Sequence, residues 1–129
     1  MAAKILVVED NEDLLKLLEF ILKQFDYEVT TAVHGKEALE TLKDKDNLPD
    51  VIICDIMMPE MDGYTLITHL LENENTGNIP VIVMTGKGQT RELFQDKDNV
   101  CEFVEKPFEP SDLKTVIEKV LTEHGKKHS

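Results

Sequence analysis

The chain has 129 residues, which corresponds to one domain that can bury a hydrophobic core without disulfides or structural metal ions. Its 26 acidic and 14 basic side chains give a net charge of -12. This charge argues against direct nucleic-acid binding, because phosphate neutralisation dominates such binding. No apolar stretch approaches the roughly 20 residues that span a bilayer, and the first residues have no signal-peptide layout. We therefore expect a soluble chain that meets basic surfaces or cations.

Both cysteines, Cys54 and Cys101, fall within segments that we predict to be strands. The simplest interpretation is a reduced, cytoplasmic chain, although a disulfide between the two residues remains open. Zinc is not expected, because no group of cysteines and histidines has the spacing of a zinc site.

Apolar runs of strand length alternate along the chain with segments of helical period. Strands are predicted at 4–9, 28–33, 50–54, 80–84 and 101–105. Helices are predicted at 13–25, 36–44, 64–73, 89–95 and 111–123, of which 89–95 has the weakest pattern. Asn11 is a candidate N-cap for the first helix. The apolar stripe of that helix is predicted to comprise Leu14, Leu17, Leu18, Ile21, Leu22 and Phe25.

The alternation of strand and helix predicts right-handed βαβ units and a parallel sheet. The first, third and fourth strands are continuously apolar, which indicates central strands covered on both faces. The second and fifth alternate more, as edge strands do. These observations favour an α/β fold of the flavodoxin-like (βα)5 type, doubly wound, with five parallel strands in the order 2-1-3-4-5. Ligands of such sheets bind beyond the carboxyl ends of the strands, between the first and the third.

Polar residues stand at those strand ends. Glu9 and Asp10 end the first apolar run, Asp55 the third and Thr85 the fourth, and Lys106 follows the fifth strand. Clustered carboxylates repel one another unless a cation lies among them, and oxygen ligands favour Mg²⁺ or Mn²⁺. Asp55 could then act as a nucleophile toward phosphorus, with the metal, Lys106 and Thr85 sharing the transferred charge.

Glu9-Asp10, Asp55, Thr85 and Lys106-Pro107, in this order, resemble the signature set of the CheY-like receiver domain of two-component response regulators. The resemblance extends from Lys4 to Leu121. It implies a receiver domain over residues 1–123, followed by a polar tail at 124–129. The chain is then expected to be a stand-alone receiver or the excised receiver of a longer regulator.

The resemblance implies that Asp55 accepts a phosphoryl group from a histidine kinase or a histidine phosphotransfer protein. Asp10 and Asp55 would bind Mg²⁺ through their side chains, Glu9 through water and Met57 through its backbone carbonyl.

Roles in signalling follow from the same resemblance. Thr85 would donate a hydrogen bond to the phosphoryl oxygen, Lys106 would pair with it, and the peptide bond before Pro107 would be cis. Phe103 corresponds to the aromatic residue that moves inward with Thr85, so these two residues would form the switch that alters binding of a downstream protein or output domain. Kinase pairing is expected on the first helix and its neighbouring loop, and the exposed candidates are Glu12, Asp13, Lys16, Glu19 and Lys23.

The chain also departs from the family. The segment 96–100 replaces the usual Gly-Ala pair before the fifth strand, and we expect a short fourth helix. The family's standard dimer contact, through the face of the fourth helix, fifth strand and fifth helix, is therefore in doubt. A monomer or weak dimer is expected. Met57 and Lys87 occupy positions that tune the lifetime of the phosphorylated state. Neither is suited to orient an attacking water, so we expect a lifetime of minutes or longer.

Each motif has a simpler interpretation as well. Asp55 could merely terminate a strand, Glu9 and Asp10 could cap the first helix, and the Thr85-Gly86 pair could be a turn. Lys106 could be a surface charge. Phe103 could be an ordinary core residue.

Two other functional classes remain open. A haloacid-dehalogenase-like phosphatase also uses an aspartyl phosphate, but its general acid would stand where Met57 stands. A degenerate receiver could act by binding alone, but such receivers usually lack the acids or the lysine, and this chain has both.

Overall fold

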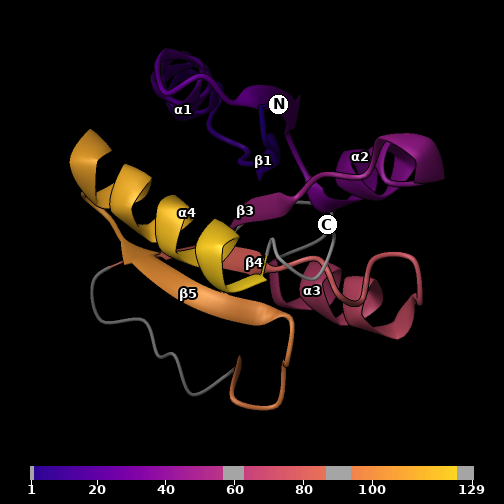
Figure 1. The fold of residues 1–129 in the computed structure, drawn as a ribbon. Coiled ribbons are helices and arrows are strands. Elements are labelled where there is room, and N and C mark those ends of the chain that lie inside the picture. Colours follow the sequence, from indigo (N-terminus) through magenta and orange to yellow (C-terminus); the bar gives the residue numbers. More distant parts are fainter. Residues whose placement is uncertain (1, 57–62, 87–93, 125–129) are drawn as a thin grey trace.

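The structure is a computed structural model, and it describes residues 2–56, 63–86 and 94–124. The elements in this part of the chain are β1 Lys4–Val8, α1 Glu12–Gln24, β2 Glu28–Ala32, α2 Gly35–Thr41, the 3-10 helix η1 Lys45–Asn47, β3 Val51–Asp55, α3 Gly63–Glu72, β4 Val81–Thr85, β5 Val100–Glu105 and α4 Pro110–His124. The strands pair in parallel in the order β2-β1-β3-β4-β5 (Figure 1). The predicted fold and strand order are therefore confirmed.

Most predicted boundaries lie within one residue of the observed ones, and the exception is the second helix. The sequence predicts a helix over 36–44, but α2 ends at Thr41. The Asp44 carboxylate accepts a hydrogen bond from the backbone N–H of Asp46 and caps η1, which the sequence analysis does not predict. The predicted helix at 89–95 lies outside the described residues, except for its last two positions.

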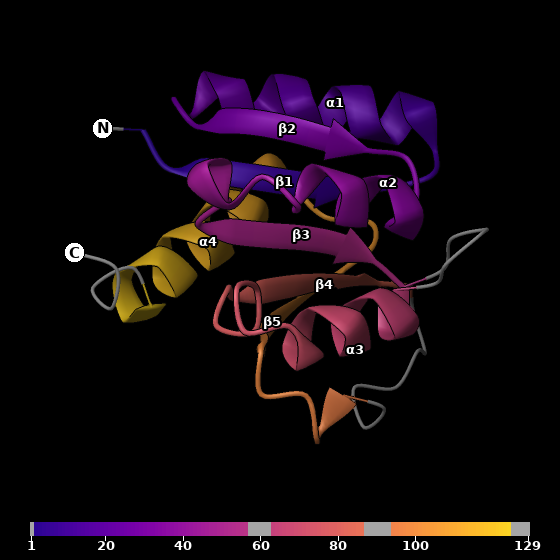
Figure 2. The ribbon, with the colours of Figure 1, turned by 90° about the vertical axis from the view of Figure 1, so that its right-hand side faces the viewer.

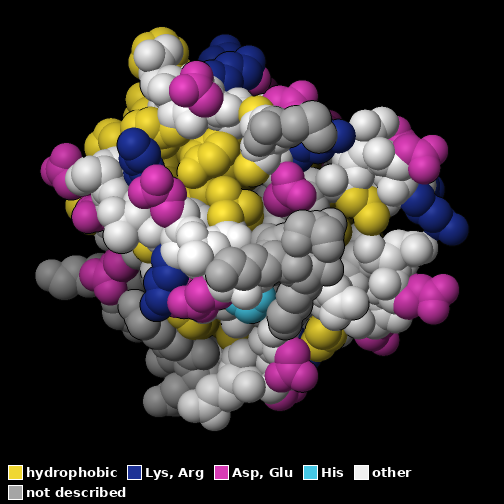
Figure 3. Space-filling model, viewed as in Figure 1, with side chains coloured by type: hydrophobic (Ala, Val, Ile, Leu, Met, Phe, Trp, Pro, Cys, Tyr) yellow, Lys and Arg dark blue, Asp and Glu magenta, His cyan; other side chains and the backbone are white. Residues whose placement is uncertain are grey.

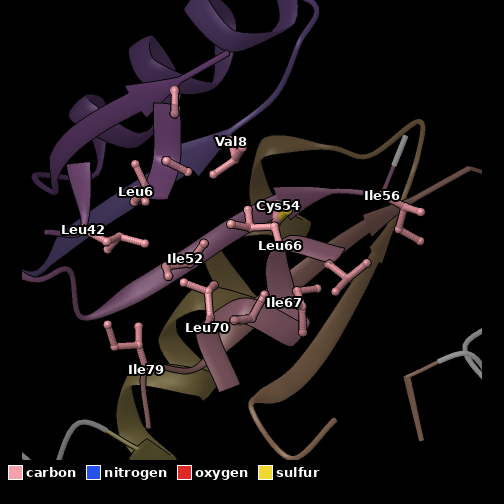
Figure 4. Packing of buried hydrophobic residues seen from close by; sticks show 14 of the residues in the cluster. Leu6, Val8, Leu42, Ile52, Cys54, Ile56, Leu66, Ile67, Leu70 and Ile79 are labelled. Atoms are coloured by element: carbon pink, nitrogen blue, oxygen red, sulfur yellow. The ribbon is translucent and has the colours of Figure 1, made fainter. Parts of the chain in front are cut away.

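Helices cover both faces of the sheet. In Figures 1 and 2, α1 and α4 lie on one face and α2 and α3 on the other. Successive strand residues point to opposite faces, so each central strand contributes to two cores. In β3, Val51 and Ile53 pack with α1 and α4, whereas Ile52 and Cys54 pack with α2 and α3. Figure 4 shows this second core, in which α3 contributes Leu66, Ile67 and Leu70.

The predicted apolar stripe of α1 needs a correction. The helix buries Leu15, Leu18 and Leu22, which follow a three-four spacing on one side. Leu17 was assigned to the stripe but is 53% exposed, because it points about 100° away from its neighbour Leu18 around the helix. Asn11 is confirmed as the N-cap, since its side chain accepts a hydrogen bond from the N–H of Leu14 at 3.0 Å.

Acidic side chains are spread over the face of the molecule seen in Figure 3, with lysine side chains among them. This distribution fits the net charge of -12, because no broad basic area stands out among the described residues on that face.

Candidate functional site

Parallel pairing of β1 with β3 brings the predicted acids together at the carboxyl edge of the sheet. Val8 pairs with Cys54, so Glu9 and Asp55 follow at neighbouring positions. One carboxylate oxygen from each of Glu9, Asp10 and Asp55 lies within 4.8 Å of the others. Glu9 and Asp55 are buried, with exposed fractions of 1% and 7%, whereas Asp10 is exposed. The site therefore combines two buried carboxylates with one that faces solvent.

Lys106 reaches the buried carboxylates from the end of β5. Its Nζ lies 3.1 Å from Glu9 Oε1 and 3.4 Å from Asp55 Oδ2. Its backbone N–H donates to the carbonyl oxygen of Thr85 at 2.7 Å, which keeps the lysine beside the end of β4. The peptide bond between Lys106 and Pro107 is cis. One ammonium thus contacts two of the clustered acids.

The pKa of Glu9 is raised from 4.5 to about 7. Burial is the main cause, because it disfavours the charged carboxylate, and the negative charge of Asp55 and the Asp10 side chain add to it. The N–H of Asn11, which donates to Glu9 Oε2 at 3.1 Å, and the Lys106 ammonium both act in the opposite direction.

Burial by itself lowers the pKa of Lys106, but the hydrogen bond to Glu9 and the charge of Asp55 outweigh it, so the net shift is upward. Lys106 therefore stays charged, although it does not fully offset the repulsion among the acids. The residual negative charge and the oxygen donors fit a divalent cation of the Mg²⁺ type.

Thr85 lies at the same edge of the sheet. It is the last residue of β4, is 4% exposed, and follows Met84, the register partner of Asp55. Its own register partner in β5 is Glu105. The hydroxyl therefore belongs to the strand next to the one that carries Asp55, at the level of its carboxyl end.

The family model of the response regulator receiver domain matches residues 5–118. The chain belongs to the response regulator receiver domain family.

This chain aligns with different fractions of its longer relatives. Two-component response regulator ARR11 of Arabidopsis thaliana is 37% identical over 120 residues, which are 92% of this chain and 22% of ARR11. Response regulator Rre1 of Synechocystis is 31% identical over 119 residues, 91% of this chain and 51% of Rre1. This chain thus spans only about a fifth to a half of the length of these relatives.

A solved structure of similar length is the chemotaxis response regulator CheY4 of Vibrio cholerae. It superposes with a TM-score of 0.86 at 27% identity, and the match covers 94% of this chain and 100% of that chain. This likeness agrees with the receiver fold observed here. Among the described residues, no helix combines the length and apolarity that a membrane crossing requires.

The receiver domain brings together Glu9, Asp10, Asp55 and Lys106 as a cluster in contact, with Thr85 at the same edge. Phe103 lies farther back in β5, paired in register with Val83, and its ring centre is 6.0 Å from that of Phe94. Met57 and Lys87 lie outside the described residues. Cys54 and Cys101 are not joined by a disulfide in the structure.

Two contacts of the receiver site were not predicted from the sequence. The first is the pair between Lys106 and Glu9, which no local pattern indicates across 97 positions. The second is Gly63, the first residue of α3, which packs on the backbone of Asp55. A Cβ at Gly63 would lie 2.4 Å from the Asp55 carbonyl oxygen. The sequence signal for it is a glycine directly after a stretch rich in methionine and acidic residues.

Proposed function

We propose that this receiver domain is a phosphoacceptor switch in which Asp55 receives a phosphoryl group from a histidine kinase or a histidine phosphotransfer protein. One observation carries the proposal. Asp55 is a buried carboxylate at the carboxyl end of a central strand, between the Lys106 ammonium at 3.4 Å and a cluster of acids that can hold a metal. A carboxylate that merely terminated a strand would need neither.

The transfer forms one bond and breaks another. A carboxylate oxygen of Asp55 attacks the phosphorus of a phosphohistidine, and the P–N bond to the imidazole breaks. The electron pair of that bond stays on the leaving nitrogen, which a proton neutralises. The product is an acyl phosphate on Asp55, and Lys106, now between Glu9 and the new phosphoryl oxygens, offsets part of its charge.

Asp10 and Asp55 would hold Mg²⁺ through their carboxylates, and Glu9 would act through water. The backbone carbonyl of Met57 is the remaining proposed ligand and lies outside the described residues. When bound, the cation supplies positive charge to the phosphoryl oxygens. Glu9, which is the most buried acid, is the residue that most needs this charge in order to stay ionised.

The consequence of transfer is a change in partner binding. We assign to Thr85 a hydrogen bond to the phosphoryl oxygen and to Phe103 the conformational response. Support comes from the position of both residues on adjacent strands, with Phe103 two residues before the register partner of Thr85. Met57 and Lys87 would set the lifetime of the phosphorylated state.

The decisive experiment is covalent capture. We would incubate the protein with phosphoramidate and Mg²⁺ and record the intact mass, with Asp55→Asn as the test variant and Asp50→Asn as the matched control at the other end of β3. The expected result is a gain of one phosphoryl group in the wild type and in Asp50→Asn, and none in Asp55→Asn. No gain in a folded wild type, or the same gain in Asp55→Asn, would refute the proposal.

The phosphatase alternative has its own test. Incubation with p-nitrophenyl phosphate and Mg²⁺ should release p-nitrophenol no faster than the phosphorylated Asp55 loses its phosphoryl group. Turnover that depends on Asp55 and exceeds this rate would instead favour an enzyme.

A further inference from the structure

The segment 96–100, which departs from the usual family sequence, is fastened to helix α3. The Nζ of Lys97 lies 4.9 Å from the centre of the Tyr64 ring and 3.6 Å from Asp96 Oδ2, and the side chain of Lys97 is only 10% exposed. Two residues on, the Asn99 amide donates to the carbonyl oxygen of Ile67 at 3.3 Å, and its backbone carbonyl accepts from the N–H of Val81 at 2.8 Å. The segment thus contacts both α3 and β4.

Three aromatic rings continue this contact across the sheet edge. The centres of Tyr64 and Phe94 are 5.7 Å apart with an interplanar angle of 48°, and those of Phe94 and Phe103 are 6.0 Å apart at 59°. These values are typical of favourable tilted pairs, which have a preferred geometry. We call Tyr64, Phe94 and Phe103 the aromatic row. Phe94, its middle member, is 3% exposed and cannot shift without displacing a neighbour.

The Tyr64 end of the aromatic row lies next to Gly63, which packs on the backbone of Asp55. Tyr64 follows Gly63, whose backbone N–H donates to the carbonyl oxygen of Ile56 at 2.7 Å. Gly63 packs so closely that a Cβ would overlap the Asp55 carbonyl oxygen and approach Ile56 Cα to 2.8 Å. A small displacement of the Asp55 backbone would therefore be passed to the first turn of α3, since no space separates them.

We propose that Tyr64, Phe94 and Lys97 are positioning residues for Asp55 and connect it to Phe103 by a route through α3 that does not involve Thr85. In this arrangement Lys97 fixes Tyr64 from one side and Phe94 supports it from the other, so the start of α3 is held against Asp55. The inference rests on the proposed function, because it describes how the same site is held and how its state reaches β5.

The contacts have the properties that such a role requires. A cation above a ring and a tilted ring pair are both sensitive to orientation, so a rotation of Tyr64 would change its contacts with Lys97 and Phe94 together. The residues belong to α3, to the segment before β5 and to β5 itself, which gives a continuous series of contacts from Asp55 to the sheet edge.

The experiment follows Phe103 directly. The chain has five phenylalanines, so uniform labelling with 4-fluorophenylalanine gives a simple fluorine NMR spectrum in which substitution assigns each resonance. The Phe103 resonance and the rate of phosphoryl capture from phosphoramidate would be measured in wild type, Phe94→Leu, Lys97→Met and Lys97→Arg. Lys114→Met is the matched control, because Lys114 lies 5.2 Å above the ring of Phe25, away from the aromatic row.

Phosphorylation should displace the Phe103 resonance in the wild type, and Phe94→Leu should reduce that displacement by about half or more. Lys97→Met should slow phosphoryl capture about threefold, and Lys97→Arg should restore it because a guanidinium also stacks on a ring. Lys114→Met should match the wild type in both measurements.

Two results overturn the inference. One is phosphoryl capture by the wild type with an unchanged Phe103 displacement in Phe94→Leu. The other is a capture rate in Lys97→Met equal to that of Lys114→Met. Both would leave the proposed function intact, because Asp55 would still be phosphorylated. Absence of capture in the wild type is a different outcome, which would overturn the proposed function together with the inference.

Discussion

The two ends of strand β3 each have an aspartate, and the structure holds these residues in opposite ways. Asp50, just before the strand, exchanges hydrogen bonds with the backbone of Lys4: its Oδ2 accepts from the Lys4 N–H at 2.8 Å, and its own N–H donates to the Lys4 carbonyl at 2.7 Å. Asp55, at the other end, is buried near Lys106 and two further acids. The same residue type thus joins two strands by hydrogen bonds at one end of β3 and adds to a cluster of charges at the other end.

The difference separates a structural end of the sheet from a functional one. Hydrogen bonds between backbone and side chain at the amino end are complete without a ligand. The carboxyl end contains a buried acid with a raised pKa, so its electrostatic energy falls when a cation or a positively charged partner arrives. Clusters of this kind reduce stability in the free protein and are retained where chemistry requires them.

The largest expected effect is the pH dependence of stability in metal-free protein. Unfolded Glu9 loses its proton near pH 4.5 and folded Glu9 near pH 7, so the folded state binds more protons between these values. The free energy of unfolding should therefore fall, by up to about 3 kcal/mol, as the pH rises through this window. Urea denaturation in EDTA at several pH values would measure the fall.

Glu9→Gln should remove most of that decline. Glu28→Gln, which changes an exposed carboxyl at the amino end of β2, should keep it. Equal pH profiles for wild type and Glu9→Gln would show that the buried acid is not the source.

Removal of Lys106 should come next in size. Lys106→Met leaves Glu9 without its ammonium partner and should lower the free energy of unfolding by about 2 kcal/mol at pH 8. The loss should be smaller at pH 5, where folded Glu9 is largely protonated. Lys4→Met, at the structural end, changes an exposed contact with Asn47 and should alter stability by less than about 1 kcal/mol at either pH. A loss at pH 5 as large as that at pH 8 would contradict the electrostatic explanation.

The stabilisation by Mg²⁺ should depend on the acids at the carboxyl edge of the sheet and not on Asp50 at the amino end of β3. Mg²⁺ at ten times its dissociation constant should stabilise the wild type by about 1.4 kcal/mol at pH 8. Asp10→Asn should lose this gain and Asp50→Asn should retain it, because only Asp10 lies in the carboxylate cluster. Thermal unfolding with and without Mg²⁺ would record the difference. A gain of equal size in all three proteins would place the cation elsewhere.

The smallest effect concerns local strain at the structural end. Asp26, between α1 and β2, has a φ of 68°, a left-handed conformation that glycine adopts more readily. Asp26→Gly should raise the free energy of unfolding by about 0.5 kcal/mol or leave it unchanged, with no effect on phosphoryl capture. Chemical denaturation and intact mass would test both statements, and a clear loss of stability would show that the Asp26 side chain makes a contact of its own.

Local pattern was sufficient for the elements of the sheet. The three central strands are short apolar runs, and the more alternating segments at 28–33 and 101–105 correctly indicated the edge strands. The errors in the predicted elements arose where a single side chain determines the end or the orientation of a helix. Asp44 caps η1 and so ends the preceding helix earlier than its apolar pattern suggests, and Leu17 is apolar but lies on the solvent side of α1.

The sequence alone determined which residues could reach the site. Acids, a hydroxyl and a lysine stand at the carboxyl ends of predicted parallel strands, and parallel pairing forces those ends to one edge. Tertiary structure alone decided how these groups interact. The contact of Lys106 with Glu9, the packing of Gly63 on Asp55 and the aromatic row join residues from different elements, and burial raises the pKa of Glu9. Periodicity reports which side of an element is apolar, whereas distances and desolvation depend on what the fold places on the other side.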